Sequence, residues 1–213
     1  YEQALQIVSN AKQMKYFEDA KARFCFLEAE ICAELGNMDR AIEKCDECIS
    51  LETEQDFFSE ARFMRINLAL TKNDFESALQ HAEQFIEKGA RDSYYYAALY
   101  FRPFCLSKLG KEEAAEKYYK EAISLYRMAT LQNAEAFDAY LYRAMCLKEI
   151  RQYEEALKLL EFIENMSNQI AEVHTIRADV YKLTGKEGLA KEELEKAFQL
   201  KPELKAVYSE GGE

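Results

Sequence analysis

The sequence predicts an all-α protein built from repeated helix–turn–helix units. Only seven of its 213 residues are glycine and two are proline, whereas these turn-forming residues normally make up about 12% of a chain. Apolar residues make up 49% of the chain and recur at steps of three and four, the period of an amphipathic helix. Similar segments also recur every 34 to 41 residues. These features exclude disorder, collagen-like repeats and most folds with many strands.

The net charge restricts the class of ligand. Asp and Glu number 39 against 28 Lys and Arg, which gives a formal charge of −11 and a pI near 4.9. Because nucleic acids and anionic membranes attract basic patches, we expect no nucleic-acid partner. No apolar run approaches the length of about 18 residues that spans a bilayer, so we expect no membrane insertion. No signal peptide is visible, and we expect a cytoplasmic protein, although the missing initiator Met leaves a truncated chain open.

The repeats share an alanine in the second helix of each unit. Apolar residues follow this alanine at four and seven positions, so that all three lie on one helical stripe. A second helical pattern precedes each turn. We expect the alanine to allow close packing of the two helices, because a larger side chain would push them apart. These anchor residues are Ala4, Ala41, Ala78, Ala115, Ala156 and Ala190.

Each pair of helices is expected to be joined by a tight turn in left-handed backbone. Gly36, Gly110 and Gly185 occupy this position, and glycine adopts it without a steric penalty. Asn73 is the next most favourable residue. Arg151 is poorly suited, so we expect its turn to be wider or strained.

Pro103 lies within the helical pattern that runs from Tyr94 to Leu109. A proline inside a helix removes one hydrogen bond and clashes with the carbonyl four residues earlier, here that of Leu99, at a cost of about 3 kcal/mol. We expect a kinked helix, and a helix that begins at Arg102 is the alternative.

These patterns resemble the tetratricopeptide repeat (TPR) family. The likeness covers nearly the whole chain, although the period exceeds the family's usual length and only the last unit has the closing proline. The resemblance implies a right-handed α-solenoid of TPR-like units, whose concave face binds peptide or protein segments. The residues of the last unit that match the family pattern are Ala178, Tyr181, Gly185, Ala190, Leu194, Ala197 and Pro202.

We therefore predict a single array over residues 1–213, with about eleven helices and a short C-terminal cap. Residues 1–14 would form the second helix of a partial unit. The five full units would span 20–54, 55–92, 93–132, 133–168 and 169–202, followed by a cap and tail over 203–213.

The resemblance also implies that the first helix of each unit lines a binding groove. Residues at fixed offsets before each anchor would form an aromatic trough with an acidic rim, suited to an apolar peptide or amphipathic helix that carries Lys or Arg. The alternative is a register error of one residue, which would bury these side chains between helices. The expected binding residues are Phe26, Phe63, Asn67, Leu70, Tyr100, Phe104, Leu141, Met145 and Lys148. The expected rim residues are Glu30, Glu34, Glu60, Asp138, Glu172 and Asp179.

One type of groove does not fit. TPR domains that bind the Hsp70/Hsp90 C-terminal tail hold its carboxylate with Lys, Asn and Arg side chains. The matching positions here are Phe26, Glu30, Met64, Ala97 and Phe101, which form no cationic clamp. We therefore expect a partner other than such a tail.

The six cysteines lie in helical patterns, four of them in the first full unit. Cys45 and Cys48 form a CxxC motif, and Cys25 and Cys32 lie in the preceding helix. A zinc or redox site is one interpretation. We favour buried, reduced core residues, because a three-residue step within a helix is what core packing requires.

No pattern of catalysis or cofactor binding is present. The two histidines, His81 and His174, lack a ligand partner four residues on, and no phosphate-binding or nucleophile motif occurs. We expect no metal, no cofactor and no enzymatic activity, and predict a protein–protein interaction scaffold. The alternatives are the peptide-sensing arm of a larger protein and a self-assembling TPR homo-oligomer.

Overall fold

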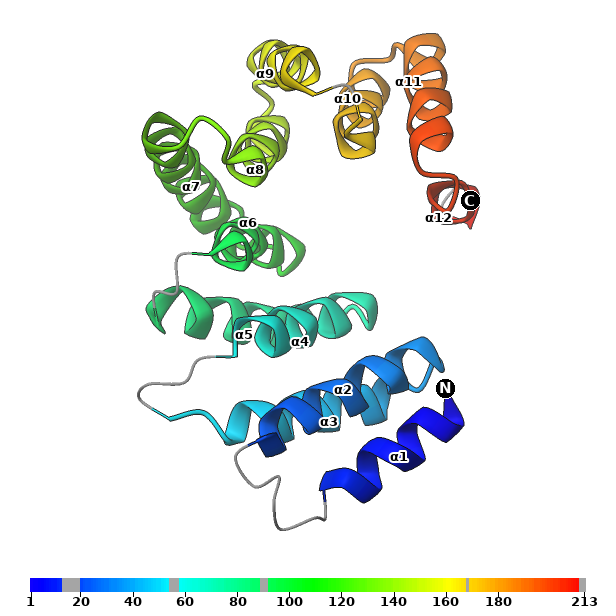
Figure 1. Ribbon diagram of the computed structural model, residues 1–213. Coiled ribbons are helices and arrows are strands. Elements are labelled where there is room, and N and C mark those ends of the chain that lie inside the picture. The colour runs from blue at the N-terminus through cyan, green and yellow to red at the C-terminus, as the bar shows by residue number, and fades with distance from the viewer. Residues whose placement is uncertain (13–19, 54–57, 89–91, 168, 211–213) are drawn as a thin grey trace. The chain divides into compact units, whose positions relative to one another are not determined.

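The computed structural model describes residues 1–12, 20–53, 58–88, 92–167 and 169–210. Within these ranges the chain forms twelve helices and no strand, which confirms the all-α prediction of about eleven helices and a C-terminal cap. The helices pack in successive pairs joined by short turns (Figure 1). Several predicted unit boundaries, at residues 14, 54–55 and 168, lie outside the described residues.

The chain divides into two compact units, and the N-terminal one spans Tyr1–Ala115. Its first helix packs against the second, and the following helices form pairs that stack on their neighbours. The helices of this unit are α1 (Glu2–Lys12), α2 (Lys21–Glu34), α3 (Met38–Ser50), α4 (Ser59–Thr71), α5 (Phe75–Lys88) and α6 (Ser93–Lys108).

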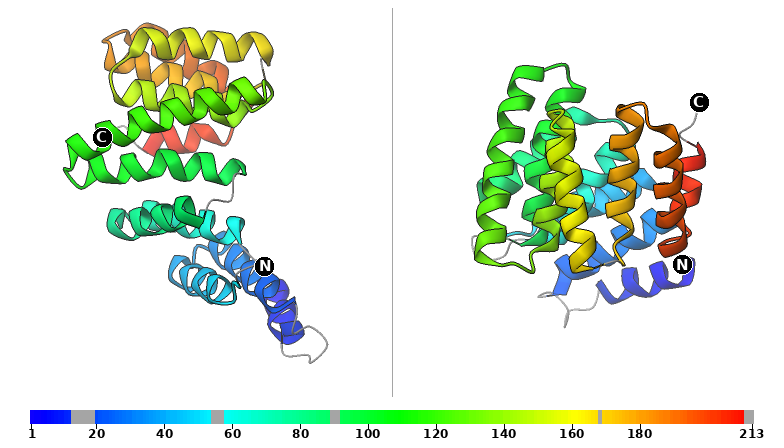
Figure 2. Two further views of the ribbon diagram at one scale, coloured as in Figure 1. Left: turned by 90° about the vertical axis from the view of Figure 1, so that its left-hand side faces the viewer. Right: turned by 90° about the horizontal axis from the view of Figure 1, so that it is seen from above.

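The C-terminal unit spans residues 116–213. Its first helix is the longest, and its last short helix packs against the helix that precedes it (Figure 2). The single array over the whole chain stays a prediction. The helices of this unit are α7 (Glu112–Gln132, which begins in the N-terminal unit), α8 (Phe137–Glu149), α9 (Tyr153–Met166), α10 (Ala171–Leu183), α11 (Glu187–Leu200) and α12 (Leu204–Glu210).

The anchor alanines lie where the paired helices meet. Five of the six are buried, with 1% or less of their surface exposed. Ala4 differs and is exposed, because α1 turns Leu5 rather than Ala4 toward the core cluster of α2 and α3. The five buried anchors are Ala41, Ala78, Ala115, Ala156 and Ala190.

The five turns share one backbone geometry. Gly36, Gly110 and Gly185 have φ near 73°, as predicted, and Asn73 and Arg151 also adopt the left-handed region, with φ of 56° and 62°. In each turn two backbone N–H groups return to the last turn of the helix, as in a Schellman motif. For Arg151 these bonds are its own N–H to Lys148 O at 3.0 Å and Gln152 N–H to Leu147 O at 2.8 Å.

The turn at Arg151 corrects one expectation. Its hydrogen bonds match those of the glycine turns, so the turn is not wider than the others. The strain remains, because a residue with a Cβ pays about 1–2 kcal/mol in left-handed backbone.

Pro103 lies within a continuous helix. Helix α6 runs from Ser93 to Lys108, and the alternative in which a helix begins at Arg102 is wrong. The proline ring is fully buried, and the expected kink stays a prediction.

The packing at Ala156 predicts a large loss from a small change. Ala156 is fully buried against Leu147 and Val180, so the Ala156→Leu variant should lose about 1–3 kcal/mol of unfolding free energy through overpacking. Urea denaturation measures this loss. The matched control is Ala4→Leu at the exposed anchor, which should change stability by at most about 0.5 kcal/mol. An unchanged midpoint for Ala156→Leu would contradict the helix-pair register.

The turn geometry predicts that Arg151→Gly stabilises the protein by about 1 kcal/mol, because glycine relieves the left-handed strain without losing a hydrogen bond. Thermal and urea denaturation measure the gain. The reverse change, Gly110→Arg, should destabilise by a similar amount. A stability loss in Arg151→Gly would show that the arginine side chain contributes more than the backbone strain costs.

Candidate functional site

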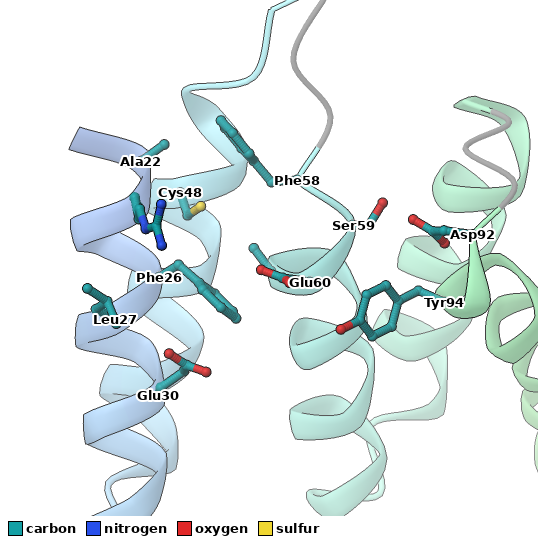
Figure 3. Close-up of a pocket in the computed structure, with 12 residues that line it drawn as sticks. Ala22, Phe26, Leu27, Glu30, Cys48, Phe58, Ser59, Glu60, Asp92 and Tyr94 are labelled. Carbon is teal, nitrogen blue, oxygen red and sulfur yellow. The ribbon is translucent and has the colours of Figure 1, made fainter. Parts of the chain in front are cut away.

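Two adjoining pockets lie between α2, α4 and the first turn of α6, all in the N-terminal unit. Their volumes are about 690 Å³ and 490 Å³. Four residues line both pockets, and we call this shared lining the waist. Figure 3 shows these four side chains turned toward the same space from three different helices. The waist residues are Phe26, Glu30, Glu60 and Tyr94.

The two pockets together form a groove. It exists because α2 has one face that packs in the core and another that lines the pockets. Cys25, Ala29 and Cys32 lie on one face and pack in the core with α3. Phe26 and Glu30, four residues apart, lie on another face and point toward α4 (Figure 3). The same helix therefore closes the core on one side and forms a wall of the groove on the other.

Helix α4 forms the opposite wall by the same periodicity. Glu60, Phe63 and Asn67 lie at steps of three and four and line the groove. The Asn67 side-chain amide donates a hydrogen bond to the Phe63 carbonyl at 3.1 Å, which fixes its orientation. The helix therefore presents an acidic, an aromatic and an amide side chain along one stripe.

Aromatic rings form the centre of this wall. The Phe63 ring lies 4.9 Å from that of Tyr94 and 6.2 Å from that of Phe101, in tilted arrangements. Tilted contacts of this kind hold the rings in place beside the groove. The pocket beyond the waist, which we call the methionine pocket, is lined by Met38, Met64 and Leu68.

The waist carries negative charge that no ion pair neutralises, although Arg23 lines the adjoining first pocket. Neither Glu30 nor Glu60 forms an ion pair or a side-chain hydrogen bond within the described part of the chain. Desolvation raises the pKa of Glu30, and the charge of Glu60 raises it further. Desolvation also raises the pKa of Tyr94, with added contributions from Glu60, Asp92 and Glu30. The two carboxylates therefore repel each other across the groove.

A buried ion network holds the start of α4 in place. The Glu52 carboxylate accepts hydrogen bonds from Arg62 Nε at 2.8 Å, Lys88 Nζ at 2.9 Å and the Phe58 N–H at 3.0 Å. Burial acts to raise the pKa of Glu52, but these hydrogen bonds outweigh it and lower the pKa to about 2. The network links the segment before α4 to α4 and α5, and so fixes where Glu60 stands.

The structure places the predicted groove residues in three different settings. Phe26, Phe63 and Asn67 line the two pockets. Leu70 and Phe104 are half-buried and pack against a core cluster of α4, α5 and α6. The Lys108 ammonium also lies over the Phe104 ring, 5.3 Å from its centroid. A binding role for these five residues stays a prediction.

Tyr100 requires a correction. We expected this ring to be exposed in a trough, but only 4% of its surface is accessible. It packs against Phe104 in a stacked arrangement and against Phe101 edge-on, both at 5.8 Å. Its neighbours along α6 therefore cover it, and the residue belongs to the core.

Leu141, Met145 and Lys148 lie in the C-terminal unit, apart from the pockets described above. Leu141 and Met145 are half-buried against the cluster of α8, α9 and α10. Lys148 is 13% exposed and pairs with Asp179 at 3.2 Å. Because these residues and Phe104 belong to different compact units, a shared trough stays a prediction.

Tyr94 and Met38 are groove residues that sequence reasoning missed. Tyr94 precedes the predicted inward positions because α6 has 16 residues and begins with an additional turn, whereas α4 has 13. The capping residue Asp92, whose carboxylate accepts from Tyr95 N–H at 2.9 Å, was the available signal for this start. Met38 opens α3, where the pattern of first helices offered no signal.

The cysteines lie in the core. Cys25 and Cys48 share one cluster, Cys32 and Cys45 share the next, and all six cysteines are buried and outside any disulfide. Burial raises the pKa of Cys45 and Cys48 to about 12. Since thiolates rather than thiols bind metals and attack disulfides, these side chains are poorly suited to a zinc or redox site. No group of potential metal ligands occurs among the described residues.

The family model described as the tetratricopeptide repeat matches residues 22–55, 98–127 and 171–204. Each matched segment begins in the first helix of a pair and extends into or through the second. These three segments are tetratricopeptide repeats. This confirms the resemblance that the anchors and turns predicted.

Solved TPR structures have the same fold. The thermophilic TPR protein TTC0263 of Thermus thermophilus is 19% identical, with a TM-score of 0.70 over 89% of this chain and 97% of that chain. A TPR protein from Parabacteroides merdae is 18% identical, with a TM-score of 0.66 over 92% of this chain and 72% of that chain. These likenesses confirm the α-solenoid class. A comparison with curated proteins gives no match.

The TPR fold implies a protein–protein interaction scaffold, since these repeats generally bind protein or peptide partners and are generally non-enzymatic. Among the described residues, no helix is long and apolar enough to cross a membrane. The cytoplasmic location stays a prediction.

The Glu52 network predicts stability that depends on pH. Because the folded-state pKa lies near 2, below the ordinary value of 4.5, its contribution is present above about pH 5 and is lost as the pH falls toward 2. Glu52→Gln should therefore lose on the order of 2 kcal/mol at neutral pH, and its difference from the parent should shrink in acid. Urea denaturation across this pH range measures both effects. The exposed control Glu83→Gln should show neither, and a difference that is independent of pH would contradict the network.

Proposed function

We propose that the TPR chain is a non-enzymatic scaffold that binds an apolar peptide or helical segment of a partner protein in the groove of its N-terminal unit. The partner segment carries at least one basic residue. The observation that carries the proposal is the waist, where aromatic rings and two carboxylates without an ion-pair partner face one open space.

Several features support this site over a merely irregular surface. Its walls are helices rather than loops, and α4 is held by the Glu52 network, so the groove is formed before a ligand arrives. A preformed groove reduces the entropy lost on binding. Phe26, Phe63 and Tyr94 provide rigid apolar area, which is typical of the residues that dominate binding energy at interfaces.

Charge also favours a basic partner. The chain as a whole has a formal charge of −11, so a basic segment is attracted over a distance and then meets the local carboxylates. An acidic partner would add a third negative charge to a site in which two already repel each other. The expected affinity therefore falls as the salt concentration rises.

This function predicts which variants lose binding. Random peptides displayed on phage and selected on the full chain should yield binders, and Phe63→Ala should weaken them by about tenfold, as expected for loss of a buried apolar anchor. Fluorescence anisotropy with the selected peptides measures the affinity. Leu131→Ala removes an apolar side chain that is 79% exposed on α7 and should leave binding unchanged.

Denaturation midpoints distinguish lost binding from lost folding in each variant. Equal affinity for Phe63→Ala and the parent would contradict the proposed groove. So would selected peptides that depend on Leu141 and Met145 instead, because binding would then lie in the C-terminal unit.

A further inference from the structure

We infer that the groove recognises a two-residue signature in its ligand: an arginine placed at the waist and an apolar side chain placed in the methionine pocket. This inference rests on the proposed function and adds the chemistry of the segment that binds. Glu30 and Glu60 select the arginine, and Met38, Met64 and Leu68 select the apolar residue.

The waist brings two carboxylates together. Glu30 on α2 and Glu60 on α4 stand on opposite walls and turn toward each other (Figure 3). A cation between them would relieve their repulsion and pair with both. The aromatic faces of Phe26 and Tyr94 border the same space and favour a cation that is flat and weakly hydrated.

Arginine meets these requirements better than lysine. Its planar guanidinium presents several N–H donors in a fixed fork, so that one group can donate to two carboxylates on different helices. It also stacks on aromatic rings, whereas the lysine ammonium is compact and strongly hydrated. The site therefore favours arginine over lysine when the cation pairs with both Glu30 and Glu60.

The C-terminal unit contains an internal counterpart of this pairing. Lys148 lies on α8, in the helix pair α8–α9. Its ammonium contacts Asp179 on α10, in the next helix pair, at 3.2 Å. Asp179 holds the same position before its anchor alanine as Glu30 does. None of the four waist residues is basic, and Arg23, which lines the adjoining first pocket, forms no ion pair with Glu30 or Glu60.

The methionine pocket adjoins the waist. Methionine side chains are flexible and polarizable, and they adapt to apolar groups of different shape. Thr71 and Asn67 line the same pocket, and the Asn67 amide already donates to the Phe63 carbonyl. The side-chain oxygen of Asn67 therefore remains as an acceptor for a backbone N–H of the ligand.

The test uses the peptides selected on the full chain, each made in four forms. One form is unchanged, one has its arginine replaced by citrulline, one has it replaced by lysine, and one has its apolar residue replaced by alanine. Citrulline keeps the shape of arginine but removes its charge. We expect citrulline to weaken binding by about tenfold or more and lysine to weaken it less, since charge-assisted pairs are the strong ones.

Protein variants then assign each ligand residue to its contact. With Glu60→Gln the difference between arginine and citrulline should shrink to about twofold, while the alanine effect persists. With Met64→Ala the alanine effect should shrink and the arginine effect persist. Glu83→Gln removes the same charge from an exposed position outside the groove and should alter neither.

The outcomes separate this inference from the proposed function. Selected peptides that depend on Phe63 but contain no basic residue, or that bind equally well with citrulline, would overturn the signature and leave the groove intact. Peptides that bind independently of both Phe63 and Glu60 would overturn the groove itself.

Discussion

The close approach of the two helices in each pair is the constraint on which the rest of the structure depends. An alanine at the crossing point allows this approach, and the five buried anchors are almost inaccessible to solvent. A left-handed residue five positions earlier ends the first helix and turns the chain back, so that the second helix meets the first at this alanine. Each unit thus combines one small side chain with one strained turn.

The groove is a consequence of this pairing. Because α3 covers only one face of α2, the other face remains available, and it meets α4 across an open space. Apolar residues on the covered face build the core, whereas Phe26 packs only partly against the cluster of Cys25, Cys48 and Ala61 and also lines the groove. The chain retains aromatic and acidic residues there, although solubility alone would favour small polar ones.

The two compact units differ in how their charged side chains are paired. In the C-terminal unit buried charges are neutralised within the chain, as His174 and Arg177 both contact Glu193, at 2.8 Å and 3.0 Å. Lys148 and Asp179 pair in the same unit. In the N-terminal unit the Glu52 network is neutralised in this way, but Glu30 and Glu60 are not.

Much of the fold could be predicted from the sequence, because the anchors and turns are local signals with a fixed spacing. The sequence could not distinguish the two apolar faces of a first helix, and this is why Tyr100 was expected in a groove but lies under Phe104 and Phe101. The sequence placed Tyr94 in the first helix of its unit but did not show that its side chain lines the groove. At Arg151 the left-handed turn forms although a residue with a Cβ disfavours that backbone conformation.

The most direct test of the central claim is methyl NMR of the methionines while a selected peptide is added to the full chain. Met38 and Met64 line the groove of the N-terminal unit, whereas Met145 lies in the C-terminal unit and Met166 is exposed on α9. The account predicts that the Met38 and Met64 signals shift with peptide concentration while those of Met145 and Met166 stay in place. Shifts at Met145 without shifts at Met38 and Met64 would contradict it.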